Sequence, residues 1–195
     1  MSKLGLGLKV AVVAALTAAV SACVSIPEVT GPYKAGKVTY TLDRSWNDIT
    51  SVTQQNKGIH LLTLDGPQLN SLYLSEGIKV GQHLARPNSR REKTTPSWRT
   101  DMGVLEQVEF VRDSVEAYGY ARVEATAPRP VTISGQRGVR FEMTALTSSG
   151  LQIKGFGQLV AKDDLAYVAI YLAPNEHFYP VSNASALAAM DSLSL

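Results

Sequence analysis

Alternating apolar and polar positions predict three β-strands in the first half of the chain. The clearest is at residues 37 to 42, where Val38, Tyr40 and Leu42 would share a buried face. Residues 43 to 46, three polar residues followed by a tryptophan, predict a turn. The other two apolar runs, which are separated by Asp65-Gly66-Pro67, are residues 59 to 64 and 69 to 74.

Two stretches have apolar residues at helical spacing instead. The first covers residues 101 to 118, with Asp101 as the expected N-cap. The second covers residues 182 to 193, with Ser182 or Asn183 as the expected N-cap. The apolar residues that give the first stretch its period are Val104, Leu105, Val108, Val111, Val115 and Tyr118.

The second half of the chain is a series of apolar runs with short separators, which predicts successive antiparallel strands. One of these separators is the proline-containing stretch at residues 128 to 130. A sheet of this kind needs helices on its faces, so the expected fold class is α+β, a mostly antiparallel sheet flanked by helices. The four predicted strands are residues 120 to 126, 139 to 147, 151 to 161 and 165 to 172.

The N-terminus has the layout of an export signal. Lys3 and Lys9 precede an uncharged apolar run at residues 10 to 20, with no acidic residue among the first nine. That run is shorter than the roughly 20 apolar residues that a membrane-spanning helix needs. We therefore expect residues 1 to 22 to be a signal peptide that is removed.

The residues that end this signal resemble the bacterial lipobox. Val20, Ser21 and Ala22 stand immediately before Cys23, the sole cysteine of the chain. One cysteine forms no internal disulfide, so lipidation of Cys23 explains its presence in an exported protein better than a free thiol does. An ordinary secretory signal followed by a chance cysteine is the alternative. Residues 24 to 36, with two prolines and two glycines, predict a tether ahead of one domain at 37 to 195.

Charge is balanced overall but uneven locally. Removing residues 1 to 22 takes two of the 19 basic residues and leaves 17 against 17 acidic ones, so nucleic-acid binding is not expected. Residues 104 to 118 carry four acidic side chains and one arginine, and they could attract the basic loop at residues 85 to 99. An anionic envelope component, such as lipopolysaccharide phosphate or peptidoglycan carboxylate, is the alternative partner for that loop. Its candidate contact residues are Arg86, Arg90, Arg91 and Lys93.

The sequence predicts no catalytic residue, metal or cofactor. His60, His83 and His177 have no metal-ligand spacing, and no nucleophile motif of a serine hydrolase is present. Asp65-Gly66 and Glu76-Gly77 suggest turns more than a carboxylate pair. Core packing, or else a ligand groove, is the expected role of the aromatic residues Phe156, Tyr167, Tyr171, Phe178 and Tyr179.

Several short motifs resemble a family of uncharacterised proteobacterial envelope lipoproteins, and the second half is similar to PsbP-like domains. These motifs are Thr63-Leu64-Asp65-Gly66, Gly138-Val139-Arg140-Phe141-Glu142 and Ala173-Pro174-Asn175-Glu176-His177-Phe178. The resemblance implies a PsbP-like α/β/α sandwich and, with Val24 after the cysteine, an outer-membrane anchor facing the periplasm. A non-enzymatic binding module of the envelope is the preferred function. A binder of a small apolar ligand and an envelope-polymer hydrolase are the alternatives.

Overall fold

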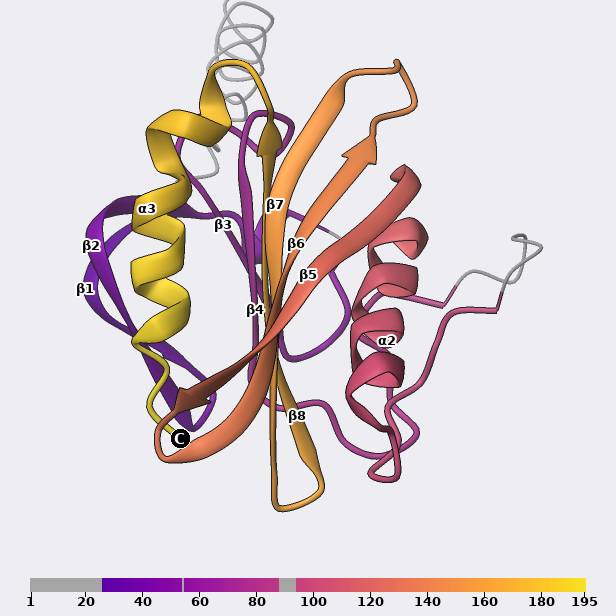
Figure 1. Cartoon of the computed structure of the whole chain (residues 1–195). Coiled ribbons are helices and arrows are strands. Elements are labelled where there is room, and N and C mark those ends of the chain that lie inside the picture. Colours follow the sequence, from indigo (N-terminus) through magenta and orange to yellow (C-terminus); the bar gives the residue numbers. More distant parts are fainter. Residues whose placement is uncertain (1–25, 54, 88–93) are drawn as a thin grey trace, which may run out of the picture.

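The computed structural model describes residues 26 to 53, 55 to 87 and 94 to 195, which form one eight-stranded antiparallel sheet (Figure 1). Along the sheet the strands follow the order β1-β2-β3-β4-β8-β7-β6-β5. The strands are β1 (Glu28–Ala35), β2 (Val38–Asp48), β3 (Ile59–Thr63), β4 (Ser71–Ser75), β5 (Ala121–Ile133), β6 (Gln136–Leu146), β7 (Gln152–Lys162) and β8 (Leu165–Pro174). The helices are α2 (Val104–Ala117), α3 (Phe178–Asp191) and the 3-10 turn η2 (Thr50–Val52).

The helices α2 and α3 cover opposite faces of the sheet, which makes three layers (Figure 1). The face toward α2 buries Leu61, Phe141 and Ile170 against the apolar stripe of that helix. The face toward α3 buries Leu72 and Tyr171 against its small side chains. Since β8 lies in the middle with both faces covered, nearly all of its residues are apolar and buried. The predicted α+β sandwich is therefore confirmed.

The helix α2 lies within the predicted range, but its first turn differs from the prediction. Gly103 is the N-cap instead of Asp101, and the Glu106 carboxylate accepts the Gly103 N–H at 2.8 Å. The negative charge of an acidic residue in the first turn also stabilises the helix, because the N-terminus is the positive end of the helix dipole. The predicted apolar stripe is buried from Val108 onward, whereas Leu105 stays 71% exposed.

The helix α3 starts four residues before the predicted position, so Ser182 is an interior residue and not the cap. Its hydroxyl donates to the Phe178 carbonyl at 2.6 Å and also contacts the Tyr171 hydroxyl. The serine is therefore satisfied inside the helix. Pro180 fits the first turn because its missing N–H has no intrahelical acceptor there. The sequence misjudged this start because serine is a common cap and proline a common breaker.

Strand β1 occupies most of the predicted tether, and this corrects the prediction for residues 24 to 36. It pairs with β2 along its length, with a register shift between Val29 and Gly31. Tyr33 and Ala35 point into the core on the α3 side. Because β1 is an edge strand, Pro32 removes no hydrogen bond that a central strand would need. Proline and glycine therefore mark an edge strand here and not a linker.

Two predicted breaks are also strand. The predicted turn at residues 43 to 46 belongs to β2. Its three polar side chains face solvent, which the sequence pattern of a turn also shows, whereas Trp46 is fully buried. The predicted separator at residues 128 to 130 belongs to β5, the other edge strand, where a register shift follows Thr126. The remaining predicted strands are confirmed as β3, β4, β6, β7 and β8.

The predicted exposed loop at residues 85 to 99 is partly wrong. Residues 88 to 93 lie outside the described part of the chain, but Trp98 is only 1% exposed. Its indole N–H donates to the Asp164 carbonyl at 3.1 Å, and its ring lies 6.0 Å from that of Phe110. Trp98, which stands between Pro96 and Arg99 in a mostly polar stretch, thus fixes the end of this loop to the core.

Candidate functional site

Most of the predicted functional residues cannot be compared with the structure. Val20, Ser21, Ala22 and Cys23 lie outside the described residues, as do Arg90, Arg91 and Lys93. Arg86 is described and is exposed to solvent. None of the described helices has both the length and the hydropathy to span a membrane.

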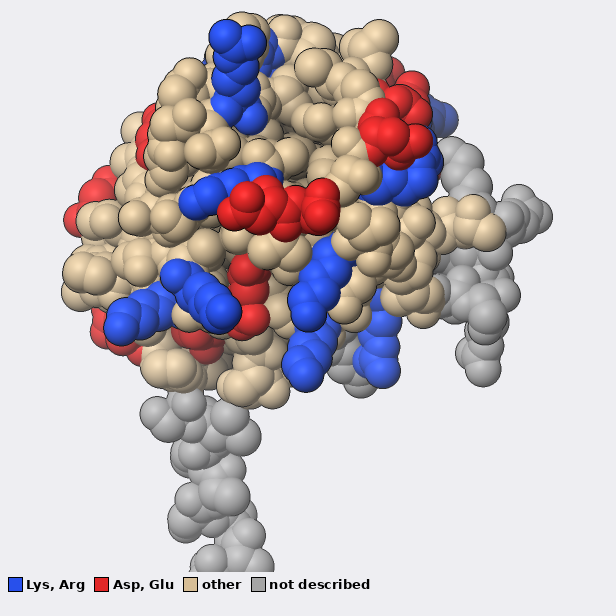
Figure 2. Space-filling model, turned by 90° about the horizontal axis from the view of Figure 1, so that it is seen from below, with Lys and Arg blue, Asp and Glu red and all other residues tan. Residues whose placement is uncertain are grey.

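Within the described residues, Arg99 shows the predicted attraction between the basic and acidic stretches. Arg99 contacts Glu106 at 3.0 Å and Asp101 at 3.1 Å, and all three side chains are at least half exposed. Such pairs contribute at most about 1 kcal/mol to stability. On the end of the molecule shown in Figure 2, Lys and Arg side chains alternate with Asp and Glu, so this end is mixed in sign.

The three histidines lie apart, as their spacing in the sequence predicted. His83 faces the Pro96 carbonyl at 2.9 Å, and His177 lies against the ring of Phe178. Within the described residues, no cluster of histidine, cysteine and carboxylate side chains could hold a metal ion.

His60 belongs to a hydrogen-bonded chain of four side chains from β1, β2, β3 and the end of β4. The Tyr33 hydroxyl donates to Asp48 at 2.8 Å and lies 2.7 Å from His60 Nδ1. The other ring nitrogen lies 2.8 Å from Glu76 Oε1. These contacts join Asp48, Tyr33, His60 and Glu76 into one continuous chain.

This chain ties strands together and does not activate a nucleophile. Burial, followed by the hydrogen bond to Asp48 and its charge, raises the pKa of Tyr33 far above its usual value. Burial of Asp48 would by itself raise its pKa, but hydrogen bonds from Thr50 and Tyr33 and the charge of His60 lower it. Asp48 is therefore a stable carboxylate, and Tyr33 is a neutral donor.

The acidic residues before Gly66 and Gly77 do not form a carboxylate pair. Asp65 precedes β4 and accepts a hydrogen bond from Asn70 at 2.7 Å, whereas Glu76 follows β4 and contacts His60. Both glycines have positive φ, 124° and 111°, which confirms the predicted turns.

One hollow on the described surface is a groove of about 420 Å³, which we name the tyrosine groove. It lies at the end of the sheet where α2 ends and where the β3–β4 and β6–β7 turns meet. None of its lining side chains carries a charge. The lining residues are Pro67, Gln68, Leu69, Tyr73, Tyr118, Gly119, Tyr120, Thr147, Ser148, Ser149 and Leu151.

Two stacked tyrosines form the floor of the tyrosine groove. The rings of Tyr73 and Tyr118 are nearly parallel, at 16°, with centroids 4.6 Å apart. The Tyr118 hydroxyl donates to the Leu84 carbonyl at 3.2 Å, which fixes the orientation of its ring. Both tyrosines are neutral at physiological pH, as an ordinary tyrosine is, and burial raises the pKa of each still further.

Hydroxyl groups of the β6–β7 turn form one rim. Thr147 and Ser149 share a hydrogen bond of 2.9 Å, and Thr147 also accepts the N–H of Leu151 at 3.1 Å. Across the described residues, neither Gln68 nor Ser148 makes a side-chain hydrogen bond within the protein, and both are exposed. These two side chains are free to bind a ligand.

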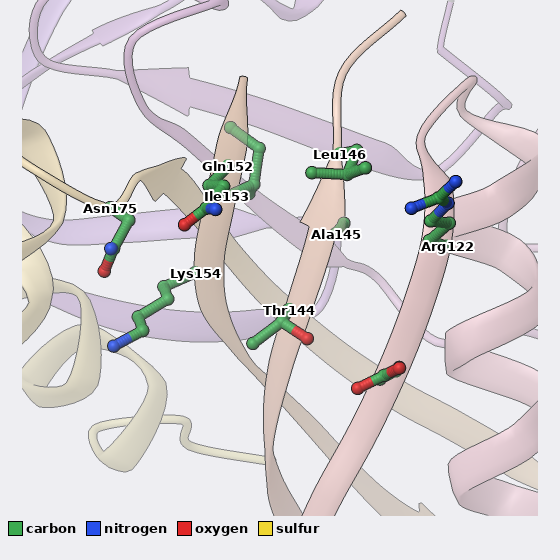
Figure 3. A pocket seen from close by; sticks show the side chains of 9 residues that line it. Arg122, Thr144, Ala145, Leu146, Gln152, Ile153, Lys154 and Asn175 are labelled. Atoms are coloured by element: carbon green, nitrogen blue, oxygen red, sulfur yellow. The ribbon is translucent and has the colours of Figure 1, made fainter. Parts of the chain in front are cut away.

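Another hollow, of about 240 Å³, lies nearby on the other face of the sheet, and we name it the charged hollow. Figure 3 shows Arg122 on one side of it, with Lys154 and Asn175 on the other. The cross-strand register places Glu124 opposite Thr144 and Thr144 opposite Lys154. The lining residues are Arg122, Glu124, Thr144, Ala145, Leu146, Gln152, Ile153, Lys154 and Asn175.

The aromatic residues predicted as core or groove form core. Phe156, Tyr167 and Tyr171 are buried on the α3 side, and Phe178 and Tyr179 pack against them. Sequence reasoning missed the tyrosine groove, because it assigned Tyr118 only to the helix stripe. Two features of the sequence could have indicated the groove: the two tyrosines on either side of a glycine at residues 118 to 120, and the Thr-Ser-Ser-Gly turn at residues 147 to 150.

Comparison with known proteins identifies the fold. No family model matches the chain, and no curated protein matches its sequence. Among solved structures, PsbP of the cyanobacterium Synechocystis superposes with a TM-score of 0.56, over 90% of this chain and 98% of that one. The chain has a PsbP-like fold.

The PsbP-like fold also occurs in yeast. The Ran-binding protein Mog1p of Saccharomyces cerevisiae superposes with a TM-score of 0.54 over 87% of this chain and 96% of its own. A point mutant of Mog1 gives a TM-score of 0.53. Sequence identity is 11 to 12% in these matches, so they establish the PsbP-like fold and leave function open.

Proposed function

We propose that this chain is a lipoprotein of a bacterial outer membrane, lipidated on Cys23, whose PsbP-like domain binds an envelope component in the periplasm without catalysing a reaction. One observation carries the proposal: the only cysteine of the chain follows Val20-Ser21-Ala22 at the end of an export signal. Two or more acyl chains on that residue would anchor the domain stably, which a single chain does not achieve.

The described polar side chains support binding over catalysis. The Tyr33–His60 chain contains two carboxylates that already have partners, and the residues in it lack a serine or cysteine nucleophile. A similar fold serves a Ran-binding protein in yeast, so a sheet with two covering helices is compatible with a binding role. These points favour a module that recognises a ligand by contact.

Two surfaces are available for binding. At one end of the sheet, α3 leaves polar side chains of β5, β6 and β7 uncovered around the charged hollow, and the tyrosine groove opens near it. The predicted basic loop with Arg86, Arg90, Arg91 and Lys93 is a separate candidate for an anionic envelope partner.

The alternative ligands receive less support. A small apolar ligand needs an enclosed apolar cavity, whereas the tyrosine groove is open and has hydroxyl and amide groups on its rim. An envelope-polymer hydrolase of the glycosidase type needs two carboxyl groups that flank one bond. Asp65 and Glu76 lie at opposite ends of β4 and do not meet that requirement.

Mass spectrometry of the native protein tests the proposal. We expect the N-terminal peptide to begin at Cys23 and to carry diacylglycerol on its sulfur, with a further acyl chain on its amine. A Cys23→Ser variant should lack the lipid and leave the outer-membrane fraction, while its domain remains folded. An unmodified Cys23, or a retained leader peptide, would contradict the proposal.

A further inference from the structure

We propose that the tyrosine groove binds a neutral carbohydrate. The inference deepens the proposed function and rests on it for the source of the ligand, an envelope glycan. The groove volume of about 420 Å³ suits a ligand of one or a few sugar rings, since small-molecule sites usually measure roughly 300 to 1,000 Å³.

The lining of the groove selects against charged ligands. All eleven of its residues are uncharged at neutral pH. A phosphate or carboxylate bound there would lose water without gaining an opposite charge, which is costly. The expected ligand is therefore polar but without net charge.

The floor suits one face of a sugar ring. A pyranose has a face of C–H groups, and such a face packs on the negatively polarised face of an aromatic ring. Tyr73 is buried and stacks on Tyr118, so the rings that a sugar can reach are the partly exposed Tyr118 and Tyr120. A rigid floor of this kind loses little conformational entropy when a ligand binds.

The rim suits sugar hydroxyls, which both donate and accept hydrogen bonds. The Gln68 amide and the Ser148 hydroxyl also do both, and within the described chain neither has an internal partner. Thr147 and Ser149 are held together by their own hydrogen bond, so the turn that carries Ser148 is ordered before binding. Gln68 and Ser148 extend from different turns on the lining of one groove.

The charged hollow provides an internal contrast. Its residues Arg122, Glu124 and Lys154 would favour an ionic ligand, and it lies at the same end of the sheet. A variant in that hollow therefore controls for non-specific effects of a new side chain in this region.

The test uses the full-length native protein in an amine-oxide detergent, because detergents with sugar headgroups would compete. Isothermal titration calorimetry with chitotriose and with maltotriose measures binding. We expect one of the two to bind, and Ser148→Trp, which fills the groove from an exposed position, to weaken that binding at least tenfold. Thr144→Trp, in the charged hollow, should change it less than twofold. Circular dichroism of both variants verifies that they fold.

The expected exclusion of charged ligands is tested with galacturonic acid oligomers of the same length, which should bind at least tenfold more weakly than the neutral trisaccharide. The inference is overturned if neither neutral trisaccharide binds, if Ser148→Trp binds as well as the unchanged protein, or if the acidic oligomer binds more tightly. Mass spectrometry of the same preparation shows whether Cys23 is lipidated. A lipidated protein that binds no sugar refutes this inference alone, and a sugar-binding protein without lipid refutes only the anchor.

Discussion

At the residue scale, Gly155 in β7 shows how closely the central strands pack. A Cβ built there would overlap the carbonyl oxygen of Tyr171 on β8, and neighbouring Gly157 accommodates the ring of Phe141 in the same way. The two glycines of this Gly-Phe-Gly string therefore allow a close approach between neighbouring strands.

Replacing Gly155 by alanine should therefore destabilise the fold by about 3 kcal/mol, because β7 and β8 must separate to admit the methyl group. Urea unfolding followed by circular dichroism measures the change. Gly150→Asn is the matched control, since Gly150 has open space around it and asparagine tolerates its φ of 84°. Its effect should stay below about 1 kcal/mol, and equal losses in the two variants would contradict the packing argument.

A second residue-scale prediction concerns Asp48, whose pKa is lowered in the folded state. A lowered pKa contributes stability above the unfolded value of about 3.9 and loses it as pH falls below that value. Asp48→Asn should thus be less stable than the unchanged protein at pH 7, and the difference should narrow as pH falls below about 3.9. Urea midpoints at pH 7, 5, 4 and 3 would reveal this. A difference that is constant with pH would rule out the carboxylate as its source.

At the element scale, one arginine joins α3 to the sheet beneath it. Arg140 on β6 is buried, donates to Gln158 Oε1 on β7 at 3.0 Å, and contacts Asp191 at the end of α3. Gln158 in turn donates to the Met190 carbonyl at 2.9 Å. These contacts satisfy polar groups at the C-terminus of the helix, where carbonyls lack intrahelical partners.

Arg140→Leu should lower the free energy of unfolding by about 2 to 3 kcal/mol, because Gln158 loses its donor while remaining buried. Hydrogen exchange should increase most in the last turn of α3. Arg99→Ala, which removes an exposed ion pair, serves as the control and should cost less than about 1 kcal/mol. If the two variants lose similar amounts of unfolding free energy, burial does not explain the contribution of the Arg140 contacts.

The elements that the sequence predicted well are those whose pattern reports burial directly. Val38, Tyr40 and Leu42 alternate because β2 has one buried face, and β8 is apolar throughout because it has two. The sequence missed β1 and the second half of β5, two edge segments whose prolines imitate a linker. An edge strand tolerates them because one row of its backbone groups faces no partner, and this cannot be known before the strand order is known.

At the scale of the whole molecule, buried tyrosines make the fold sensitive to base. Burial raises their pKa values in the folded state, that of Tyr171 to about 12. An unfolded tyrosine ionises near pH 10, so above that value the unfolded state loses protons that the folded state keeps, and stability falls. The other tyrosines raised in this way by a wide margin are Tyr33, Tyr40, Tyr73 and Tyr118.

Urea midpoints should therefore be constant between pH 8 and 9 and decrease steadily from pH 10 to 12. Tyrosinate absorbance at alkaline pH should appear together with unfolding and not before it. Tyr171→Phe should show a shallower decrease over the same interval. Tyrosinate that forms while the circular dichroism is still native would contradict the burial argument.

The candidate binding site depends on the whole molecule, and for that reason the sequence did not predict it. The tyrosine groove combines the turn before β4, the end of α2 and the β6–β7 turn, segments separated by tens of residues. Tyr118 looked like one more apolar position of a helix until the fold placed it against Tyr73. Conversely, Trp98 was assigned to a loop because no local pattern shows that its indole packs beside α2.

The early start of β1 limits how far a lipidated form could extend. Pro27 already accepts a hydrogen bond from the Asp48 N–H of β2, and it follows Cys23 by four positions, a span of at most about 14 Å. A lipidated domain joined to its anchor by so short a segment would stay close to the membrane. Its ligands would have to arrive at the membrane surface, which makes glycans and proteins close to the inner leaflet of that membrane the first ones to try.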